Sequence, residues 1–246
     1  MKVIVNGALG KMGIEITRLV CEHYCNASLA AMVDINAGNE DNLFSSLKEY
    51  DGSADVIIDF SHHTAVKELL PYAIERKIPV VIATTGHDAE EKALIEEAAK
   101  SIPVFFSANM SLGIATLCSF VKTAAKLFPD ADIEIVEKHH VNKLDAPSGT
   151  ALMLAEAACQ VRPDAYVYSG RSGMRKRDKN EIGISALRLA NVVGEHEVII
   201  ATGTQTLTLK HEAHSRSLFA EGAVAAAAFI IDKRAGLYAI SDMVAQ

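Results

Sequence analysis

The sequence predicts two domains of different architecture, an α/β domain with a parallel sheet and an α+β domain with a mixed sheet. In the first half, short apolar β-branched runs alternate with helical segments, which is the pattern of βαβ units. From about residue 111, apolar and polar residues alternate within the strand-like runs, which is typical of a sheet with one polar or helix-covered face. At 246 residues, the chain is long enough for two domains of ordinary size.

Five candidate strands of the first half are almost continuously apolar, as expected for parallel strands covered on both faces. They are 2-KVIVNG-7, 29-LAAMVD-34, 55-DVIIDF-60, 79-PVVIAT-84 and 103-PVFFSA-108. The clearest intervening helix is 88–101, where Asp88 is a natural N-cap and apolar residues recur at helical spacing. Strands that alternate with helices in this way form a parallel sheet.

The second half predicts further helices and strands, but apolar and polar residues alternate along its strands. The helices are expected at 112–128 and 150–161, and the strands at 132–140, 182–190, 195–203 and 205–212. The tail, 216–238, begins as an Ala-rich amphipathic helix that Gly236 ends or follows. Because the tail is too short to be a domain, we expect it to pack onto one of the two domains.

Charge and composition exclude several classes of protein. The formal charge of −7 argues against a general affinity for nucleic acid, and we interpret the basic run 171-RSGMRKRDK-179 as a solvated loop. Met1 leads directly into a strand, without a signal-peptide pattern, and no apolar stretch is long enough to span a bilayer. We therefore expect a cytoplasmic protein that contacts no membrane.

The four cysteines give no sign of a metal or disulfide framework. Cys21, Cys25, Cys118 and Cys159 have neither CxxC spacing nor histidines at metal-ligand spacing. We expect no metal site and no disulfide, and interpret all four residues as small buried hydrophobic side chains.

A glycine-rich turn follows the first strand and opens a helix. Gly7, Gly10 and Gly13 allow backbone amides to approach a pyrophosphate at a helix N-terminus, and Asp34 ends the second strand, where it can accept hydrogen bonds from a ribose. This context predicts a Rossmann-type dinucleotide site, although the same residues also suit a tight turn beside a solvated acid. The candidate cofactor-binding residues here are Gly7, Ala8, Leu9, Gly10, Lys11, Met12, Gly13 and Asp34.

Ile35 and Asn36 follow Asp34, so no cation stands directly beside it to receive a 2′-phosphate. NADH is therefore favoured over NADPH, with Lys11 as the residue that can compensate. Ligands of open parallel sheets lie beyond the C-terminal ends of the strands, which adds further candidates, unless these are ordinary capped turns. They are Phe60, Ala83, Thr84, Thr85, Ser107, Ala108, Asn109 and Met110. His62 and His63 lie in the same zone, and a loop position accounts for them.

The stretch 137-EKHHVNKLDAPSGTA-151 combines proton donors with an anion site. Histidine titrates nearest neutrality and lysine is a second possible donor, so His139 and Lys143 suit proton transfer. The amides and hydroxyl of 148–150 at a helix start suit a carboxylate, to which His140 adds a polar group. Each residue, taken singly, also has an explanation without a ligand. His139 and His140 could be a surface pair, Lys143 a solvated charge, and Pro147-Ser148 an ordinary helix start.

Several motifs together carry a family resemblance. GALGKMG, ATTG, SANMS, EKHHVNKLDAPSGTA, 194-GEHEV-198 and 214-HSRSLFAEGA-223 closely resemble the 4-hydroxy-tetrahydrodipicolinate reductase (dihydrodipicolinate reductase) family of the bacterial diaminopimelate and lysine pathway. The resemblance covers nearly the whole chain. It implies a dinucleotide-binding domain of 1–110 with 217–246, a substrate-binding and oligomerisation domain of 111–216, and a homotetramer.

The resemblance also implies a reaction, in which NAD(P)H delivers a hydride to a cyclic α,β-unsaturated imine dicarboxylate and tetrahydrodipicolinate forms. By the same analogy His139 is a proton donor or acceptor and Lys143 a second donor. The implied substrate-binding residues are His140, Ser148, Gly149 and Thr150. Two departures stand out: 188-RLANVV-193 replaces an Arg-Gly-Gly that many members carry, and Met110 replaces a common aromatic.

Two alternatives stay open at this point. The same two-domain plan serves other NAD-dependent dehydrogenases of amino or hydroxy acids, and fold alone does not exclude them. A non-catalytic NAD-sensing protein would also retain the glycine loop, although it would have little use for both His139 and Lys143.

Overall fold

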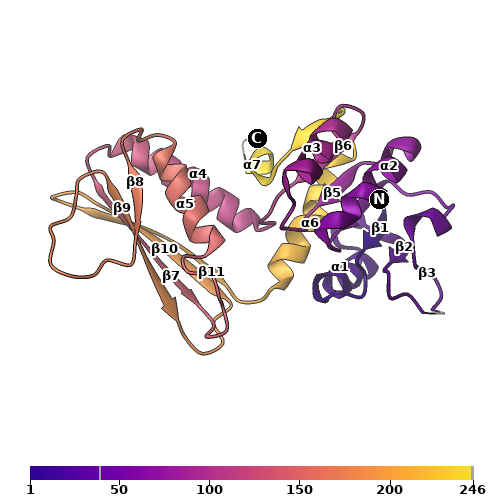
Figure 1. The fold of residues 1–246 in the computed structure, drawn as a ribbon, viewed down its shortest axis with the longest axis horizontal. Helices are drawn as coiled ribbons and strands as arrows, with labels where there is room; N and C mark the ends of the chain where they lie inside the picture. The colour runs from indigo at the N-terminus through magenta and orange to yellow at the C-terminus, as the bar shows by residue number, and fades with distance from the viewer. Residues whose placement is uncertain (39, 245–246) are drawn as a thin grey trace. The chain divides into compact units, whose positions relative to one another are not determined.

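A computed structural model describes residues 1–38 and 40–244, and the chain divides into two compact units. One unit comprises Met1–Ser111 and Ser217–Gln246, and the other comprises Leu112–Arg216. Each unit is built around its own sheet (Figure 1). Within the described residues, no helix is both long and apolar enough to cross a lipid bilayer.

The first unit contains a seven-stranded sheet in the order β12-β6-β5-β4-β1-β2-β3, and every pairing in it is parallel. The strands are β1 (Lys2–Asn6), β2 (Ser28–Val33), β3 (Leu43–Phe44), β4 (Val56–Asp59), β5 (Val80–Ile82), β6 (Pro103–Phe106) and β12 (Gly236–Tyr238). The helices are α1 (Lys11–Cys21), α2 (Val66–Arg76), α3 (Ala89–Ala98), α6 (Ser217–Ile230) and α7 (Ile240–Val244). Short 3-10 turns lie at Tyr24–Asn26, Leu47–Glu49 and His63–Ala65.

Helices cover both faces of this sheet. Ile4 and Ile57 belong to a core shared with Leu69 of α2 and Ile95 of α3. Side chains alternate along a strand, so the neighbouring residues face the other way, where Phe105 of β6 meets Phe229 of α6 with ring centroids 6.2 Å apart. A sheet buried on both sides accounts for the continuous apolar runs of its strands.

The predicted parallel sheet is confirmed, and all five predicted strands are present. The short strands β3 and β12 were not predicted. The tail helix, α6, ends at Ile230, and Gly236 begins β12 rather than ending the helix. Through α6 and β12, residues 217–246 belong to the first unit.

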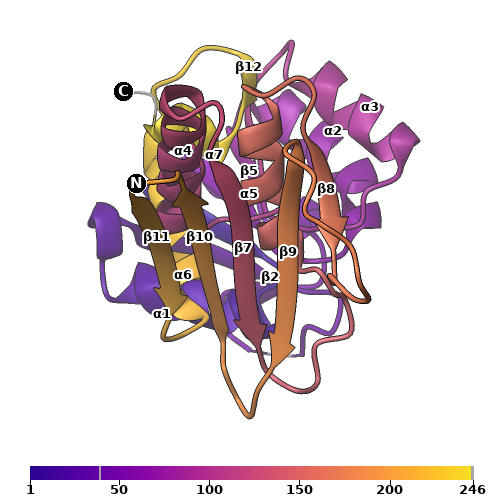
Figure 2. The same cartoon turned by 90° about the vertical axis from the view of Figure 1, so that its left-hand side faces the viewer.

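The second unit contains a five-stranded sheet in the order β11-β10-β7-β9-β8. The sheet is mixed, as predicted, but strand β8 was not predicted. The strands are β7 (Asp132–His139), β8 (Tyr166–Ser169), β9 (Glu181–Arg188), β10 (Gly194–Ala201) and β11 (Thr206–Ala213). β8, β9 and β7 run parallel, whereas β10 pairs antiparallel with β7 and β11. Figure 2 shows the strands side by side, with α4 (Leu112–Leu127) and α5 (Gly149–Cys159) behind them.

Strand β7 carries the apolar core directly into a polar site. Ile133 and Ile135 face α4 and α5 within the core of this unit. Because side chains alternate along a strand, Glu137 and His139 continue the same row, and both are buried. Two ionisable groups are therefore held under the helices, at the end of a hydrophobic row.

Residues 171–179 form a largely exposed loop, as predicted, but three of its arginines pair with carboxylates, which was not predicted. Arg171 and Arg175 both pair with Glu181, whose side chain is fully buried at the start of β9. Arg177 pairs with Asp132 through Nε at 2.9 Å. A buried carboxylate requires charged partners, and this run supplies them.

The interpretation of the cysteines as buried residues is wrong for Cys21 and Cys25, and it holds only in part for Cys118 and Cys159, which pack against the core of the second unit. Cys21 and Cys25 are exposed, and Cys118 and Cys159 are partly exposed. Cys21 ends α1 on a side different from the buried stripe of Ile16, Leu19 and Val20, and Cys25 lies in the 3-10 turn that follows. Small size alone did not determine which face of a helix or turn these residues occupy.

Ala190, in the turn between β9 and β10, has a left-handed backbone with a φ of 39°. Replacing Ala190 with glycine is expected to raise the free energy of unfolding by about 1 kcal/mol, since a β-carbon is unfavourable in this region. Urea denaturation measures the change. Ala186→Gly, inside β9, is the matched control and should lower stability; a similar loss in Ala190→Gly would contradict the prediction.

Candidate active site

Two glycines shape the turn between β1 and α1. Gly7 has a φ of +81°, and a β-carbon there would lie 2.7 Å from the carbonyl oxygen of Phe60. A β-carbon on Gly13 would overlap with the carbonyl oxygen of Gly7. α1 begins after Gly10, which provides no side-chain cap. The first amides of α1 are therefore left to an external acceptor, and an anion is the favoured one.

Asp34 ties this turn to the end of β2. Its Oδ2 accepts a hydrogen bond from the amide of Leu9 at 3.0 Å, and its Oδ1 accepts one from the amide of Asn36 at 3.0 Å. A cavity of about 640 Å³ opens beside it, lined by Gly7, Gly10 and Asp34 among others. Lys48 and Lys67 line the same cavity, and neither was predicted from the sequence.

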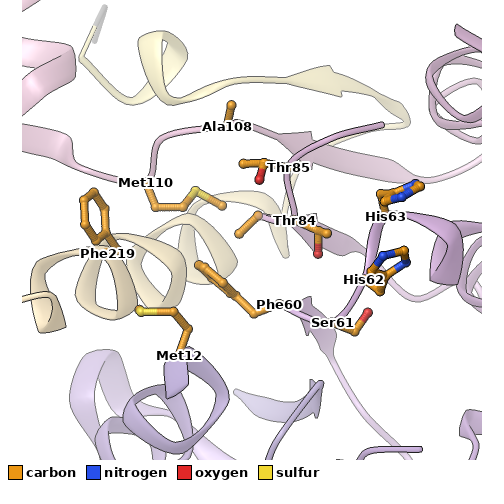
Figure 3. A pocket seen from close by; sticks show the side chains of 11 residues that line it. Met12, Phe60, Ser61, His62, His63, Thr84, Thr85, Ala108, Met110 and Phe219 are labelled. Atoms are coloured by element: carbon orange, nitrogen blue, oxygen red, sulfur yellow. The ribbon is translucent and has the colours of Figure 1, made fainter. Parts of the chain in front are cut away.

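A second cavity of about 410 Å³ lies in the same unit (Figure 3). Seven predicted cofactor residues line it: Met12, Phe60, Ala83, Thr84, Thr85, Ala108 and Met110. Phe60, Ser61 and His62 line both cavities, so a ligand longer than either can occupy the two together. Phe219 also lines the second cavity and was not predicted, because it comes from α6 in the tail.

The remaining predicted cofactor residues line neither cavity. They are Ala8, Leu9, Lys11, Gly13, Ser107 and Asn109. Some of these shape the turns instead, since Ser107 donates through Oγ to the carbonyl of Asn109 at 2.7 Å.

Asp59 links three strand ends beneath the cavities and was not predicted. The carboxylate, which is fully buried, accepts hydrogen bonds from Asn6 at 2.7 Å, Ser61 at 2.5 Å and Thr84 at 2.7 Å. Burial raises the pKa of Asp59, and these hydrogen bonds oppose that rise. Asp59 therefore orients two of the side chains that line the second cavity.

In the second unit, the carboxylate of Glu137 is the centre of a buried polar cluster. The Nδ1 atom of His139 lies 2.5 Å from its Oε2, and the amide of Ser148 donates to its Oε1 at 3.1 Å. Arg188 donates to the two oxygens at 2.9 and 3.1 Å. β7, the start of α5 and β9 thus meet at one carboxylate.

His196 of β10 completes this cluster. Its Nε2 lies 3.1 Å from Oγ of Ser148, and its ring centroid is 5.1 Å from that of His139. Burial lowers the pKa of His196 to about 4. Burial also lowers the pKa of His139, against the opposing effect of Glu137. Both imidazoles are therefore neutral at pH 7 in the absence of a ligand.

The other predicted residues of this motif lie beside the cluster. Lys143 pairs with Asp145 at 2.8 Å in the loop after β7. Ser148 caps α5 by accepting from the amide of Ala151 at 3.2 Å. A β-carbon on Gly149 would have no neighbour within 4 Å, so the start of this helix is open to a ligand. His140 begins the loop, and Thr150 lies in the first turn of α5.

Glu137, Arg188 and His196 were not singled out from the sequence. One signal was available for Glu137, because an acid two residues before His139 in a strand lies on the same face. Arg188 and His196 join the cluster through the register of β9 and β10 with β7. That register is not readable from a local pattern.

Two family models match the chain, one described as the N-terminus of dihydrodipicolinate reductase at residues 1–110 and one as its C-terminus at residues 113–244. The chain belongs to the dihydrodipicolinate reductase family. The resemblance inferred from the motifs is confirmed. Enzymes of this dihydrodipicolinate reductase family are NAD(P)H-dependent oxidoreductases.

Relatives within the dihydrodipicolinate reductase family match along the full chain. The chain is 49% identical to the 4-hydroxy-tetrahydrodipicolinate reductase of Caldanaerobacter subterraneus subsp. tengcongensis, over 99% of this chain and 98% of that protein. It is 42% identical to the same enzyme of Clostridium novyi, with the same coverage. The dipicolinate-bound dihydrodipicolinate reductase from Paenisporosarcina sp. TG-14 aligns with a TM-score of 0.83 and 25% identity, over 99% of both chains.

The structure of a probable dehydrogenase from Thermotoga maritima also aligns with the present chain, with a TM-score of 0.61 and 12% identity. The alignment covers 94% of this chain and 87% of that one. At such low identity the likeness concerns the fold alone. Because a fold can serve several activities, specificity has to be argued from the site.

Proposed function

We propose that the protein uses NAD(P)H to reduce 4-hydroxy-tetrahydrodipicolinate (dihydrodipicolinate) to tetrahydrodipicolinate, in the diaminopimelate route of lysine biosynthesis. The observation that carries this proposal is the cluster in which His139, bonded to a buried carboxylate, lies beside Ser148 at the start of α5. One motif thus supplies both a proton-transfer group and an anion site, which are the two requirements of this reduction.

The unit Met1–Ser111 with Ser217–Gln246 is proposed to bind the dinucleotide. The residues fit it, since uncapped amides at α1 suit the pyrophosphate and Asp34 suits the adenosine ribose. The second cavity, with Phe60, Thr84 and Met110, suits the nicotinamide end. A bound dihydronicotinamide would supply the hydride.

The unit Leu112–Arg216 is proposed to bind the substrate and to form the oligomer. The substrate carries two carboxylates, and the first turn of α5 offers the amides of Gly149 and Thr150 to one of them. His140 and Lys143, in the loop ahead of this helix, add hydrogen-bonding and positive character for the same anion.

His139 is proposed to transfer a proton to the ring position where electron density accumulates after hydride addition. In the free protein its pKa is lowered by burial, so the imidazole is neutral. A bound dianion beside it would raise this pKa, because a negative neighbour favours the charged form of histidine. Lys143 is proposed as a second proton donor.

A preference for NADH over NADPH is proposed, carried by Asp34. Replacing Asp34 with asparagine keeps an acceptor for the amide of Leu9 and removes the charge that repels a 2′-phosphate. The ratio of kcat/KM for NADH to that for NADPH is expected to fall at least tenfold, or about 1.4 kcal/mol. Lys48 and Lys67 line the same cavity, so Lys48→Ala is expected to change the ratio in the opposite direction. Equal ratios in wild type and Asp34→Asn would contradict the assignment.

A homotetramer is also proposed. Within Leu112–Arg216, all of which the structure describes, both long helices lie on one face of the sheet (Figure 2). The opposite face of the sheet carries apolar side chains, namely Val136, Leu187 and Ile199, because these residues alternate along their strands with residues that face the helices. Analytical ultracentrifugation tests this proposal, and a monomer at micromolar concentration would refute it.

The decisive experiment is NADH oxidation by the purified protein with enzymatically generated dihydrodipicolinate. Rapid oxidation supports the reductase. Oxidation with keto or imino acids instead would identify another NAD-dependent dehydrogenase of amino or hydroxy acids. Tight binding of NADH without oxidation of any of these substrates would identify a non-catalytic sensor.

A further inference from the structure

We infer that Glu137 and Arg188 form a positioning pair, in which Glu137 holds His139 with its Nδ1 protonated and so makes Nε2 the atom that exchanges a proton with the substrate. The inference rests on the proposed function, because it assigns the proton-transfer role to His139. It adds two residues that neither touch the nucleotide cavities nor belong to the predicted site.

The hydrogen bonds of Glu137 fix its orientation. Its Oε2 is bonded to His139 Nδ1 at 2.5 Å and Arg188 Nη1 at 2.9 Å. Its Oε1 accepts from the amide of Ser148 at 3.1 Å and from Arg188 Nη2 at 3.1 Å. Each oxygen therefore has two partners, and the side chain is fully buried. Rotation of the carboxylate would break several of these bonds at once.

The charge of Glu137 sets the tautomer of His139. Burial tends to raise the pKa of Glu137, but hydrogen bonds from Arg188, His139 and Ser148 outweigh it and lower the pKa. An ionised carboxylate only accepts hydrogen bonds, so the His139 nitrogen that it contacts must carry the hydrogen. In the neutral ring the other nitrogen, Nε2, is then an acceptor.

The surroundings of Nε2 are consistent with this role. A β-carbon on Gly194 would lie 3.2 Å from Nε2, so a glycine keeps one side of this nitrogen uncrowded. The charged or titratable groups that face His139 are Glu137 on its own strand, Lys143 in the following loop, Arg188 on β9 and His196 on β10. Among these, only the carboxylate favours a protonated ring.

Arg188 also connects the pair to the loop that carries the second proton donor. Its Nη2 donates to the carbonyl oxygen of Asp145 at 2.6 Å, and the Asp145 carboxylate pairs with Lys143 at 2.8 Å. One guanidinium, with its planar fork of donors, thus holds both Glu137 and this loop. Lysine at position 188 would retain the charge and lose the two-pronged contact.

The kinetic test compares Glu137→Gln and Glu137→Asp with wild type across pH. In wild type, kcat should fall as pH rises through the pKa of the protonated His139 in the complex. Removing the carboxylate charge lowers that pKa, so in Glu137→Gln the fall should begin at least one pH unit lower. At pH 7, kcat should drop about 100-fold or more, with KM for NADH within about twofold, as expected when a group orients a catalytic histidine.

Glu137→Asp restores the charge and should recover part of the turnover and most of the wild-type pH profile. Glu156→Gln, on the exposed side of α5, is the matched control and should retain both. A merely structural role would lower the amount of folded protein without moving the pH profile. Wild-type turnover and an unshifted profile in Glu137→Gln would overturn the inference while leaving the reductase assignment intact.

A second measurement does not depend on activity, and the protein observed in it is the wild type. ¹⁵N NMR of the wild-type imidazoles, with the His139 signal assigned by its loss in His139→Gln, reports which nitrogen is protonated. We expect the Nδ1–H form for His139. The Nε2–H form would overturn the inference whatever the enzyme assays show. Failure of the wild type to reduce dihydrodipicolinate would instead refute the proposed function.

Discussion

His139→Gln is expected to lower kcat for dihydrodipicolinate reduction by about 10²- to 10⁴-fold, the usual contribution of a general acid. Glutamine keeps a polar side chain of similar reach, but it cannot release a proton near neutral pH. His139 lines neither of the cavities assigned to the nucleotide, so KM for NADH should stay within about twofold of wild type. Steady-state kinetics with each substrate varied in turn give both constants.

The control for this variant is His23→Gln. His23 lies in a turn of the other unit, where its Nδ1 is 3.0 Å from the carbonyl oxygen of Ala27. Its replacement should leave kcat unchanged. Wild-type turnover in His139→Gln would remove the role of His139 in proton transfer, even if the reductase activity itself were demonstrated.

Lys143→Ala is expected to lower kcat by about 10²-fold and to raise KM for the dicarboxylate substrate, because the ammonium is proposed both to donate a proton and to attract a carboxylate. Lys143→Arg separates these two effects. Arginine keeps the positive charge but does not deprotonate in proteins, so it should recover KM and leave kcat low. The two variants are compared by steady-state kinetics at saturating NADH.

Lys122→Ala provides the matched control, since Lys122 lies on α4 and its Nζ donates to Gln160 at 3.2 Å. This variant should retain both constants. If Lys143→Arg regained full turnover, Lys143 would act only as a charge, and His139 would be left as the sole proton donor among the residues of this motif.

Most of the regular structure could be predicted because its signal is local. Continuous apolar runs identified the strands of the first unit, and alternation identified β7, β10 and β11. The strands β3 and β12 contain two and three residues, too few for either period to appear. Their place in the sheet is determined by pairing with β2 and β6, which are separate in the sequence.

In the candidate site too, residues with a local sequence signal could be predicted, and residues brought in by strand pairing could not. His139, Lys143 and Ser148 stand in one contiguous motif, so their types and spacing could be interpreted together. Arg188 is separated from Glu137 by 51 residues and reaches it only because β9 pairs with β7. The ion pairs of the basic run 171–179 were missed for a related reason, because its partner Glu181 becomes a buried carboxylate only once β9 has formed.

The chain leaves the first sheet after β6 and returns to it only at α6 and β12, with the whole of Leu112–Arg216 in between. On the ribosome, β6 therefore emerges long before its neighbour β12 has been translated. The inserted unit has all of its own strands by residue 213 and can fold during synthesis. Until β12 has been translated, the edge of β6 in the flanking unit stays unpaired, and it is the place where pairing with a strand of another nascent chain would interfere with folding.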